Sequence, residues 1–301
     1  MSDLGVSFSL KYAREMGVDP RKCLRSALDE LGFTRLRLMS YWDLHEPERG
    51  RYDFTDLDWQ FALAQKYGAR VSLAIGLRQP RWPESHWPPW ARQLPDDEWQ
   101  RALFDYLEAV VNRYKTHPCL ESWQLENEAL LKSFGTDGDF DRSRLKYEFA
   151  LVKSLDPAHD VIMTTSDSWG IPWHGPIPDR VGISLYRRFY DRGRYRRSRR
   201  PPSFYRLRAG LIRLITGRPV FIHELQAEPW GPQATVRLSL EEQRKTMNAA
   251  YIRQAFTFAR STRQLPAYLW GLEWWYWLKT THHQHDEWAA VAESLADSTE
   301  S

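Results

Sequence analysis

The chain has 301 residues, a formal net charge of +3 and an aromatic content of 14%. This length suits one closed α/β barrel, which typically needs about 250 residues. The small net charge gives no reason to expect a nucleic-acid partner. Cys23 and Cys119 lie far apart in the sequence without metal-ligand spacing, which argues against a disulfide framework or a zinc site and favours a reducing compartment.

The first residues lead directly into a strand-like segment, without the basic and apolar regions of a secretory signal. No apolar run reaches the roughly 18 residues that a membrane span requires. We therefore expect a cytoplasmic protein with no membrane span.

Short apolar runs rich in β-branched residues recur along the chain, and amphipathic segments separate most of them. This alternation is typical of parallel strands joined by crossover helices. The expected strands cover residues 5–10, 34–39, 70–77, 120–127, 160–165, 180–186, 218–225 and 267–274. The expected helices cover residues 20–31, 57–67, 97–114, 143–155, 204–215 and 240–261. The sequence therefore predicts the α/β class and a single (β/α)8 TIM barrel, with residues 1–301 forming one domain.

The link between the fifth and sixth expected strands, residues 166–179, departs from the helical pattern. Its glycines and prolines argue against a full helix, so an extended loop is expected there.

Two glutamates stand at the ends of apolar, strand-like runs. Glu128 closes the segment 123–128, and Glu224 lies in the segment 221–226. In a parallel barrel, the loops that follow the carboxyl ends of the strands build the active site. Hydrolysis of a glycosidic bond needs one carboxylic acid to protonate the departing oxygen and one carboxylate to attack or stabilise the sugar carbon. Both glutamates are therefore candidates for that chemistry.

Two segments carry a resemblance to a known group of enzymes. WQLENE at residues 123–128 places Asn127 before Glu128, and RLMSYWDLHEPERGRYDF occupies residues 37–54. Together with Glu224, these segments resemble the retaining glycoside hydrolases of clan A, in particular barrels of the family 42, family 35 and family 5 type. The resemblance extends from the first expected strand to the eighth. It implies an O-glycosyl hydrolase that acts on a β-linked carbohydrate substrate and needs no cofactor or metal.

The resemblance also implies roles for individual residues. Glu128 corresponds to the acid/base and Glu224 to the nucleophile, whose carboxyl groups lie about 5 to 5.5 Å apart in retaining enzymes. Arg37 would pair with the ionised nucleophile. The other substrate-binding candidates are Asn127 at the sugar 2-hydroxyl, Tyr186 as a hydrogen-bond donor to the nucleophile, Trp270 as the floor of the sugar site, Trp42 and Glu273.

Several of these candidates also have a structural interpretation. Arg37 could be an outward-facing strand charge, and Tyr186 an aromatic residue at the rim of the barrel. Trp270 could belong to the core, and Glu273 could be a solvated acid at the rim.

An arginine-rich segment, residues 187–200, follows the sixth expected strand and contains eight arginines interleaved with aromatic residues. Arginine forks bind phosphates and carboxylates, so this segment could take an anionic ligand or an anionic membrane surface. The alternative is a solvated, mobile loop without a ligand.

Two further segments admit functional interpretations. Residues 282–286 read His-His-Gln-His-Asp, but ligands that are immediate neighbours converge poorly on a metal, and no metal site is expected. Trp82, Trp87 and Trp90 follow the third expected strand and are candidates for stacking on sugars, with packing of the loop as the alternative.

The sequence therefore predicts hydrolysis with retention through a glycosyl-Glu224 intermediate. A transglycosidase is a variant of this prediction, because an alcohol can intercept the same intermediate. A barrel that binds glycans without catalysis is the alternative from another class.

Overall fold

A computed structural model describes residues 3–129, 131, 141–166 and 176–297. Eight strands follow the hydrogen-bonded order β1-β10-β9-β6-β5-β4-β3-β2 and close a barrel, which confirms the predicted (β/α)8 class. The barrel strands are β1 (Leu4–Ser7), β2 (Arg35–Met39), β3 (Arg70–Ile75), β4 (Leu120–Leu125), β5 (Asp160–Thr165), β6 (Arg180–Leu185), β9 (Val220–Gln226) and β10 (Ala267–Trp270). The longer helices are α2 (Pro20–Asp29), α4 (Thr55–Lys66), α5 (Asp96–Tyr114), α6 (Arg142–Leu155), α7 (Pro202–Thr216), α9 (Ala249–Thr262), α10 (Leu272–Thr281) and α11 (Asp286–Ala296).

By internal packing the chain divides into two compact units, and each is described by itself. The first comprises residues 1–36, 183–211 and 221–301, and the second comprises residues 37–182 and 212–220. That residues 1–301 form one catalytic domain stays a prediction. None of the described helices combines the length and the apolar character that a membrane crossing requires.

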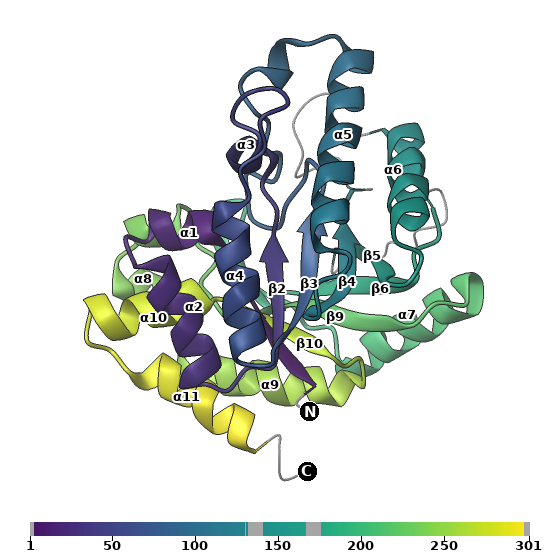
Figure 1. The fold of residues 1–301 in the computed structure, drawn as a ribbon. Coiled ribbons are helices and arrows are strands. Elements are labelled where there is room, and N and C mark those ends of the chain that lie inside the picture. Colours follow the sequence, from purple (N-terminus) through teal and green to yellow (C-terminus); the bar gives the residue numbers. More distant parts are fainter. Residues whose placement is uncertain (1–2, 130, 132–140, 167–175, 298–301) are drawn as a thin grey trace. The chain divides into compact units, whose positions relative to one another are not determined.

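In the unit containing residues 37–182, β3, β4 and β5 pair in parallel, with Ile75 beside Leu125 and Gln124 beside Ile162. Most side chains of these strands are buried, as expected where helices cover a parallel sheet. Helices α5 and α6 pack against each other (Figure 1). Asn127 and Glu128 follow the end of β4, and Arg37 lies on β2.

In the other unit, β10 pairs in parallel with both β1 and β9. Helices α9 and α11 pack together, and α10 contacts α2. This unit also holds the short helices α1 (Leu10–Glu15) and α8 (Leu240–Arg244), whereas the short helix α3 (Trp42–His45) belongs to the unit with residues 37–182. The unit that contains β9 and β10 holds Glu224 on β9 and Tyr186 just after β6.

The last expected strand was predicted too long. It ends at Trp270, and α10 begins at Leu272. Gly271 makes the turn with φ 146°, and a Cβ at this position would lie 2.7 Å from the carbonyl oxygen of Ala227. The residues after Gly271 are apolar on nearly every side of the helix, so their pattern does not distinguish a strand from a buried helix. Glu273 therefore lies on a helix.

The prediction of one helix over residues 240–261 was also wrong, because the segment holds two helices. Asn248 interrupts it, and its side chain accepts a hydrogen bond from the amide of Tyr251 at 3.0 Å and caps α9. An asparagine cap competes with continuation of the preceding helix.

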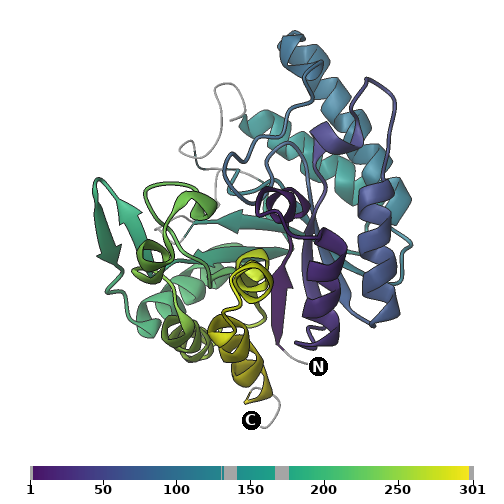
Figure 2. The same ribbon diagram turned by 90° about the vertical axis from the view of Figure 1, so that its left-hand side faces the viewer.

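Residues 188–197 of the arginine-rich segment form a hairpin, so the interpretation of this segment as a loop was wrong. Strands β7 (Arg188–Asp191) and β8 (Arg194–Arg197) pair in antiparallel register and are visible at the left of Figure 2. Arg192 and Gly193 turn the chain with φ values of 47° and 79°. Two consecutive residues with positive φ define the type I′ turn that suits the twist of a two-residue hairpin. Of the loop expected over residues 166–179, residues 167–175 lie outside the described part of the chain.

Candidate active site

Glu128 follows the end of β4 and is only 6% exposed. Its backbone amide donates to the hydroxyl of Thr164 at 2.8 Å. Its φ is 43°, and that of Glu126 is 51°. A non-glycine residue in this left-handed region costs on the order of 1–3 kcal/mol, and such positions cluster at functional sites. The backbone conformation after β4 is thus held by its surroundings, not by local preference.

Glu126 is a structural carboxylate. It is fully buried and accepts the backbone amides of Leu77 at 2.8 Å and of Arg78 at 2.6 Å. Burial raises its pKa, whereas Arg144 opposes that shift. Gly76 permits this close approach, because a Cβ there would lie 2.6 Å from the Glu126 carboxylate. Glu126 therefore fastens the loop after β3 to the end of β4.

Arg37 and Asn127 belong to one buried network. The Arg37 guanidinium donates to the side-chain oxygen of Gln124 at 2.7 Å and to that of Asn127 at 3.1 Å. Arg37 is fully buried, so its interpretation as an outward-facing charge was wrong. The Asn127 amide group in turn donates to Glu84 at 3.0 Å. Because both ends of the Asn127 side chain are engaged, its orientation is fixed.

Sequence reasoning missed Glu84. Its second carboxylate oxygen accepts the guanidinium of Arg78 at 2.8 Å, in an ion pair that is almost entirely buried. The loop that carries Glu84 folds back on itself, with Gln79 donating to the Glu84 carbonyl at 2.8 Å. The aromatic residues around Glu84 gave the only sequence signal, and they indicated stacking, not a buried ion pair.

Glu224 lies on β9 and is 6% exposed. The hydroxyl of Tyr186 donates to one carboxylate oxygen of Glu224 at 3.0 Å, and the hydroxyl of Ser184 lies 3.5 Å from the same oxygen. The Tyr186 contact is the one that the resemblance implies for this pair. Gln226, further along β9, accepts the backbone amides of Arg187 and Arg188 at 2.9 and 3.0 Å. These bonds tie the chain that follows Tyr186 to the end of β9.

Trp270 is fixed in place by a carboxylate that sequence reasoning did not single out. Its indole N–H donates to Glu228 at 2.8 Å, and its carbonyl accepts the amide of Ala227 at 2.9 Å. Trp230 is a second missed residue. It packs edge-on against Tyr186 with ring centroids 5.1 Å apart and remains 38% exposed.

The side chains of Trp42 and Glu273 are buried within the fold. The Trp42 indole is fully buried, packs near Tyr106 and donates to Glu46 at 2.6 Å. It has no exposed face for a sugar, so the proposed substrate site does not include it. Glu273 is buried as well and accepts the backbone amide of Ser9 at 2.5 Å. Its interpretation as a solvated rim acid was therefore wrong.

The loop tryptophans divide into two kinds. Trp87 and Trp90 pack against Trp42 with centroid distances of 6.2 and 5.7 Å, as the packing alternative expected. Trp82 is 76% exposed. Among the described residues, no group of three or more histidines, cysteines and acids is arranged to hold a metal ion.

Comparison with known proteins gives first the class of fold. A β-galactosidase from the Antarctic haloarchaeon Halorubrum lacusprofundi superimposes with a TM-score of 0.65 at 17% identity, covering 98% of this chain and 58% of that chain. At this identity the match shows a shared barrel fold.

Sequence comparison then gives the relatives. Residues 25–101 match the profile of glycoside hydrolase family 42, described as beta-galactosidase. Beta-galactosidase 14 of Arabidopsis thaliana is 35% identical over 162 residues, which cover 47% of this chain and 17% of that protein. Mannan endo-1,4-beta-mannosidase F of Aspergillus fumigatus is 26% identical over 152 residues, covering 44% of this chain and 32% of that protein.

The chain is therefore similar to TIM-barrel glycosidases of clan A, as its motifs predicted. The family 42 match includes the block at residues 37–54 but ends before Glu128 and Glu224. The chain spans less than a third of the two relatives' lengths.

Proposed function

We propose that the protein is a glycoside hydrolase that cleaves a β-linked glycoside or oligosaccharide with retention, using Glu224 as nucleophile and Glu128 as acid/base. The main support is the buried Glu224 carboxylate on β9, which accepts a hydrogen bond from the Tyr186 hydroxyl at 3.0 Å. The barrel fold and the similarity to a β-galactosidase and a mannosidase support the same class.

In the first step of the proposed reaction, ionised Glu224 attacks the anomeric carbon and forms a glycosyl ester. As the glycosidic bond breaks, Glu128 donates its proton to the departing oxygen. In the second step, Glu128 takes a proton from water, the water oxygen attacks the anomeric carbon, and Glu224 leaves as a carboxylate. Tyr186 restrains the attacking carboxylate, because a hydrogen bond to one oxygen limits its rotation.

Asn127 is the proposed contact for the sugar 2-hydroxyl. An NH2 group has two N–H donors, and Glu84 engages one of them at 3.0 Å. Arg37 holds the amide oxygen at 3.1 Å. The amide is thus oriented before substrate arrives, which is how a hydrogen bond that strengthens at the transition state becomes effective.

Trp270 and Trp230 are the proposed aromatic contacts. Trp270 is mostly buried and is fixed by Glu228, which suits a floor beneath one sugar ring. Trp230 is more exposed and packs edge-on against Tyr186, which suits an outer contact.

The test is intact-mass spectrometry after incubation with dinitrophenyl 2-deoxy-2-fluoro-β-galactoside and the corresponding mannoside, the sugars in the relatives' names. The native chain should gain the mass of one fluorosugar, and peptide mapping should place it on Glu224. Glu224→Gln should gain none, and Glu241→Gln, an exposed acid on α8, should behave like the native chain. Turnover of unmodified glycosides without any adduct would contradict the covalent intermediate. Absence of both turnover and adduct would favour a glycan-binding barrel.

A further inference from the structure

The β7–β8 hairpin concentrates positive charge on one concave surface. Arg187, Arg197, Ser198 and Arg199 line a pocket of about 480 Å³. The two ends of the hairpin lie side by side here, because the amide of Ser198 donates to the carbonyl of Arg187 at 2.8 Å. Arg188 and Arg197 lie opposite each other in the hairpin register. The pairing therefore brings together guanidinium groups that are distant in sequence.

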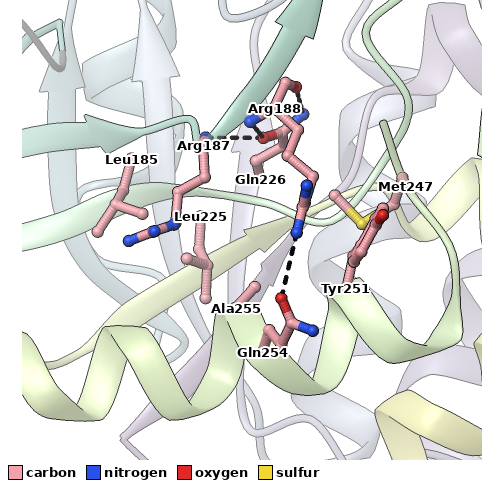
Figure 3. A pocket seen from close by; sticks show the side chains of 9 residues that line it. All are labelled: Leu185, Arg187, Arg188, Leu225, Gln226, Met247, Tyr251, Gln254 and Ala255. Atoms are coloured by element: carbon pink, nitrogen blue, oxygen red, sulfur yellow. Dashed lines mark hydrogen bonds between the residues drawn. The ribbon is translucent and has the colours of Figure 1, made fainter. Parts of the chain in front are cut away.

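Aromatic rings, not carboxylates, position the two arginines at the base of the hairpin. The Arg187 guanidinium lies 3.6 Å from the ring centroid of Phe258, and that of Arg188 lies 3.5 Å from the ring centroid of Tyr251. Arg188 also donates to Gln254 at 3.3 Å, and Figure 3 shows it reaching α9 beside Tyr251. Stacking fixes the plane of a guanidinium without neutralising it, and its N–H edge can still bind an oxyanion.

The positive charge around this pocket has little internal compensation. Within the described part of the chain, no carboxylate forms an ion pair with Arg187, Arg188, Arg197 or Arg199. By contrast, Arg196 in the same hairpin pairs with Asp191 at 3.1 Å. A folded protein that gathers like charges without counter-charges incurs a repulsion that a bound anion offsets.

The state of Arg187 agrees with this picture. Burial lowers the pKa of its guanidinium, Tyr205 opposes that shift, and the nearby positive charges of Arg197 and Arg188 add to it. One terminal nitrogen of Arg187 is buried without a hydrogen-bond partner among the described residues. Buried donors normally find an acceptor, so an external acceptor is expected.

We propose that the pocket lined by Arg187, Arg197, Ser198 and Arg199 binds a tetrahedral oxyanion, the phosphate or sulfate group of a small molecule or glycan. Its concave form and the Ser198 hydroxyl suit a discrete group in preference to a flat anionic surface. Neither Glu224 nor Tyr186 lines this pocket. The proposal does not depend on glycosidase activity.

The test is isothermal titration with inorganic phosphate and with sulfate at constant ionic strength. Two variants remove the same charge: Arg197→Ser with Arg199→Ser at the pocket, and Arg192→Asn with Arg194→Ser at the exposed tip of the hairpin. The native chain should bind saturably, the pocket variant at least tenfold more weakly, and the tip variant within twofold of native. No saturable binding by the native chain, or equal weakening in both variants, would overturn the proposal, since long-range attraction does not distinguish the two pairs.

A second arm distinguishes the source of the oxyanion. Glucose 6-phosphate is compared with phosphatidylcholine vesicles that contain phosphatidic acid, at equal phosphomonoester concentration. Tighter binding of the free ester, lost in the pocket variant, supports a small phosphorylated ligand. Tighter binding of the vesicles, again lost only in the pocket variant, supports the same oxyanion site with a lipid headgroup as the source. Vesicle binding that falls equally in both variants would show a general basic surface and overturn the pocket.

Discussion

The two strand ends that carry the candidate glutamates are built from different interactions. After β4, buried ions and amides interlock, with Arg37 bound to Asn127 and Asn127 bound to Glu84. On β9, the hydroxyls of Tyr186 and Ser184 approach one carboxylate oxygen of Glu224. Removing one member of a buried ionic network leaves several polar or charged groups unpaired. Removing one hydroxyl contact leaves fewer groups unpaired and therefore costs less stability. Changes after β4 should therefore mix stability with activity, and changes on β9 should separate them.

Glu224→Gln should have the largest effect on activity and a small effect on stability. The substitution removes the nucleophile but keeps an oxygen that can accept from Tyr186. We expect kcat/KM for aryl β-glycosides to fall on the order of 10⁴-fold or more, with an unfolding free energy within about 1 kcal/mol of native. Steady-state kinetics and urea unfolding measure the two quantities. Retention of more than a tenth of native activity would contradict the assignment of Glu224.

Glu128→Ala should remove acid/base help without removing the nucleophile. Substrates with poor leaving groups should lose about 10²- to 10⁴-fold in kcat, whereas dinitrophenyl glycosides should still form the intermediate. Azide should then accelerate turnover, because it needs no general base, and it should give a β-glycosyl azide. Product analysis by NMR checks the configuration. If azide neither accelerates turnover nor appears in the product, Glu128 is not the acid/base.

Glu126→Ala should show the opposite behaviour to Glu224→Gln. It leaves the buried amides of Leu77 and Arg78 without their acceptor and takes a negative charge from beside Arg144. We expect a loss of about 3–5 kcal/mol in unfolding free energy.

Glu121→Ala, a change on β4 itself, is the control for Glu126→Ala just after that strand. Its ion pair with Arg70 is long, at 3.5 Å, and partly exposed, so the cost should stay below about 1 kcal/mol. Similar denaturation midpoints for the two variants would show that the Glu126 contacts contribute little.

Tyr186→Phe should lower activity moderately and change stability little. The variant keeps the ring that packs on Trp230 and loses only the hydroxyl that donates to Glu224. A hydrogen bond to a charged group contributes about 1.5–3 kcal/mol, so kcat should fall roughly 10- to 100-fold. Tyr190→Phe, in the hairpin, serves as the control and should leave kcat within about twofold. Equal kcat values for the two variants would remove Tyr186 from the positioning role.

The smallest expected effect concerns Glu148. It is a change in how steeply the unfolding free energy depends on pH. Burial raises the pKa of Glu148 well above its usual 4.5, although Arg144 lies 3.1 Å away and opposes the shift. The folded state therefore binds this proton more tightly than the unfolded chain does. Stability from this group is complete below the unfolded pKa and decreases as the pH rises toward the folded pKa.

Glu148→Gln should remove that decrease. Above about pH 4.5, its unfolding free energy should decline less steeply than that of the native chain, by up to about 1.4 kcal/mol per pH unit. Urea unfolding at several pH values measures both slopes. Parallel curves would mean that Glu148 titrates alike in the folded and unfolded states.

The barrel strands were predictable because both of their faces are buried. Such strands are continuous apolar runs, and amphipathic helices separate most of them. The failures lie where one local pattern fits two structures. The apolar residues after Gly271 suited a strand as well as a buried helix, and the arginines of residues 187–200 concealed a hairpin whose turn signal is Arg192-Gly193.

The sequence by itself determined the fold class and put forward Glu128, Glu224, Asn127 and Tyr186, because these residues stand at strand ends and within recognisable motifs. Only the tertiary structure showed that Glu84 binds Asn127 and that Glu228 binds Trp270. It also showed that Trp42 is wholly enclosed. The physical reason is that periodicity reports whether a residue is buried, whereas the partner of a buried polar group depends on which distant segments the folded chain brings beside it.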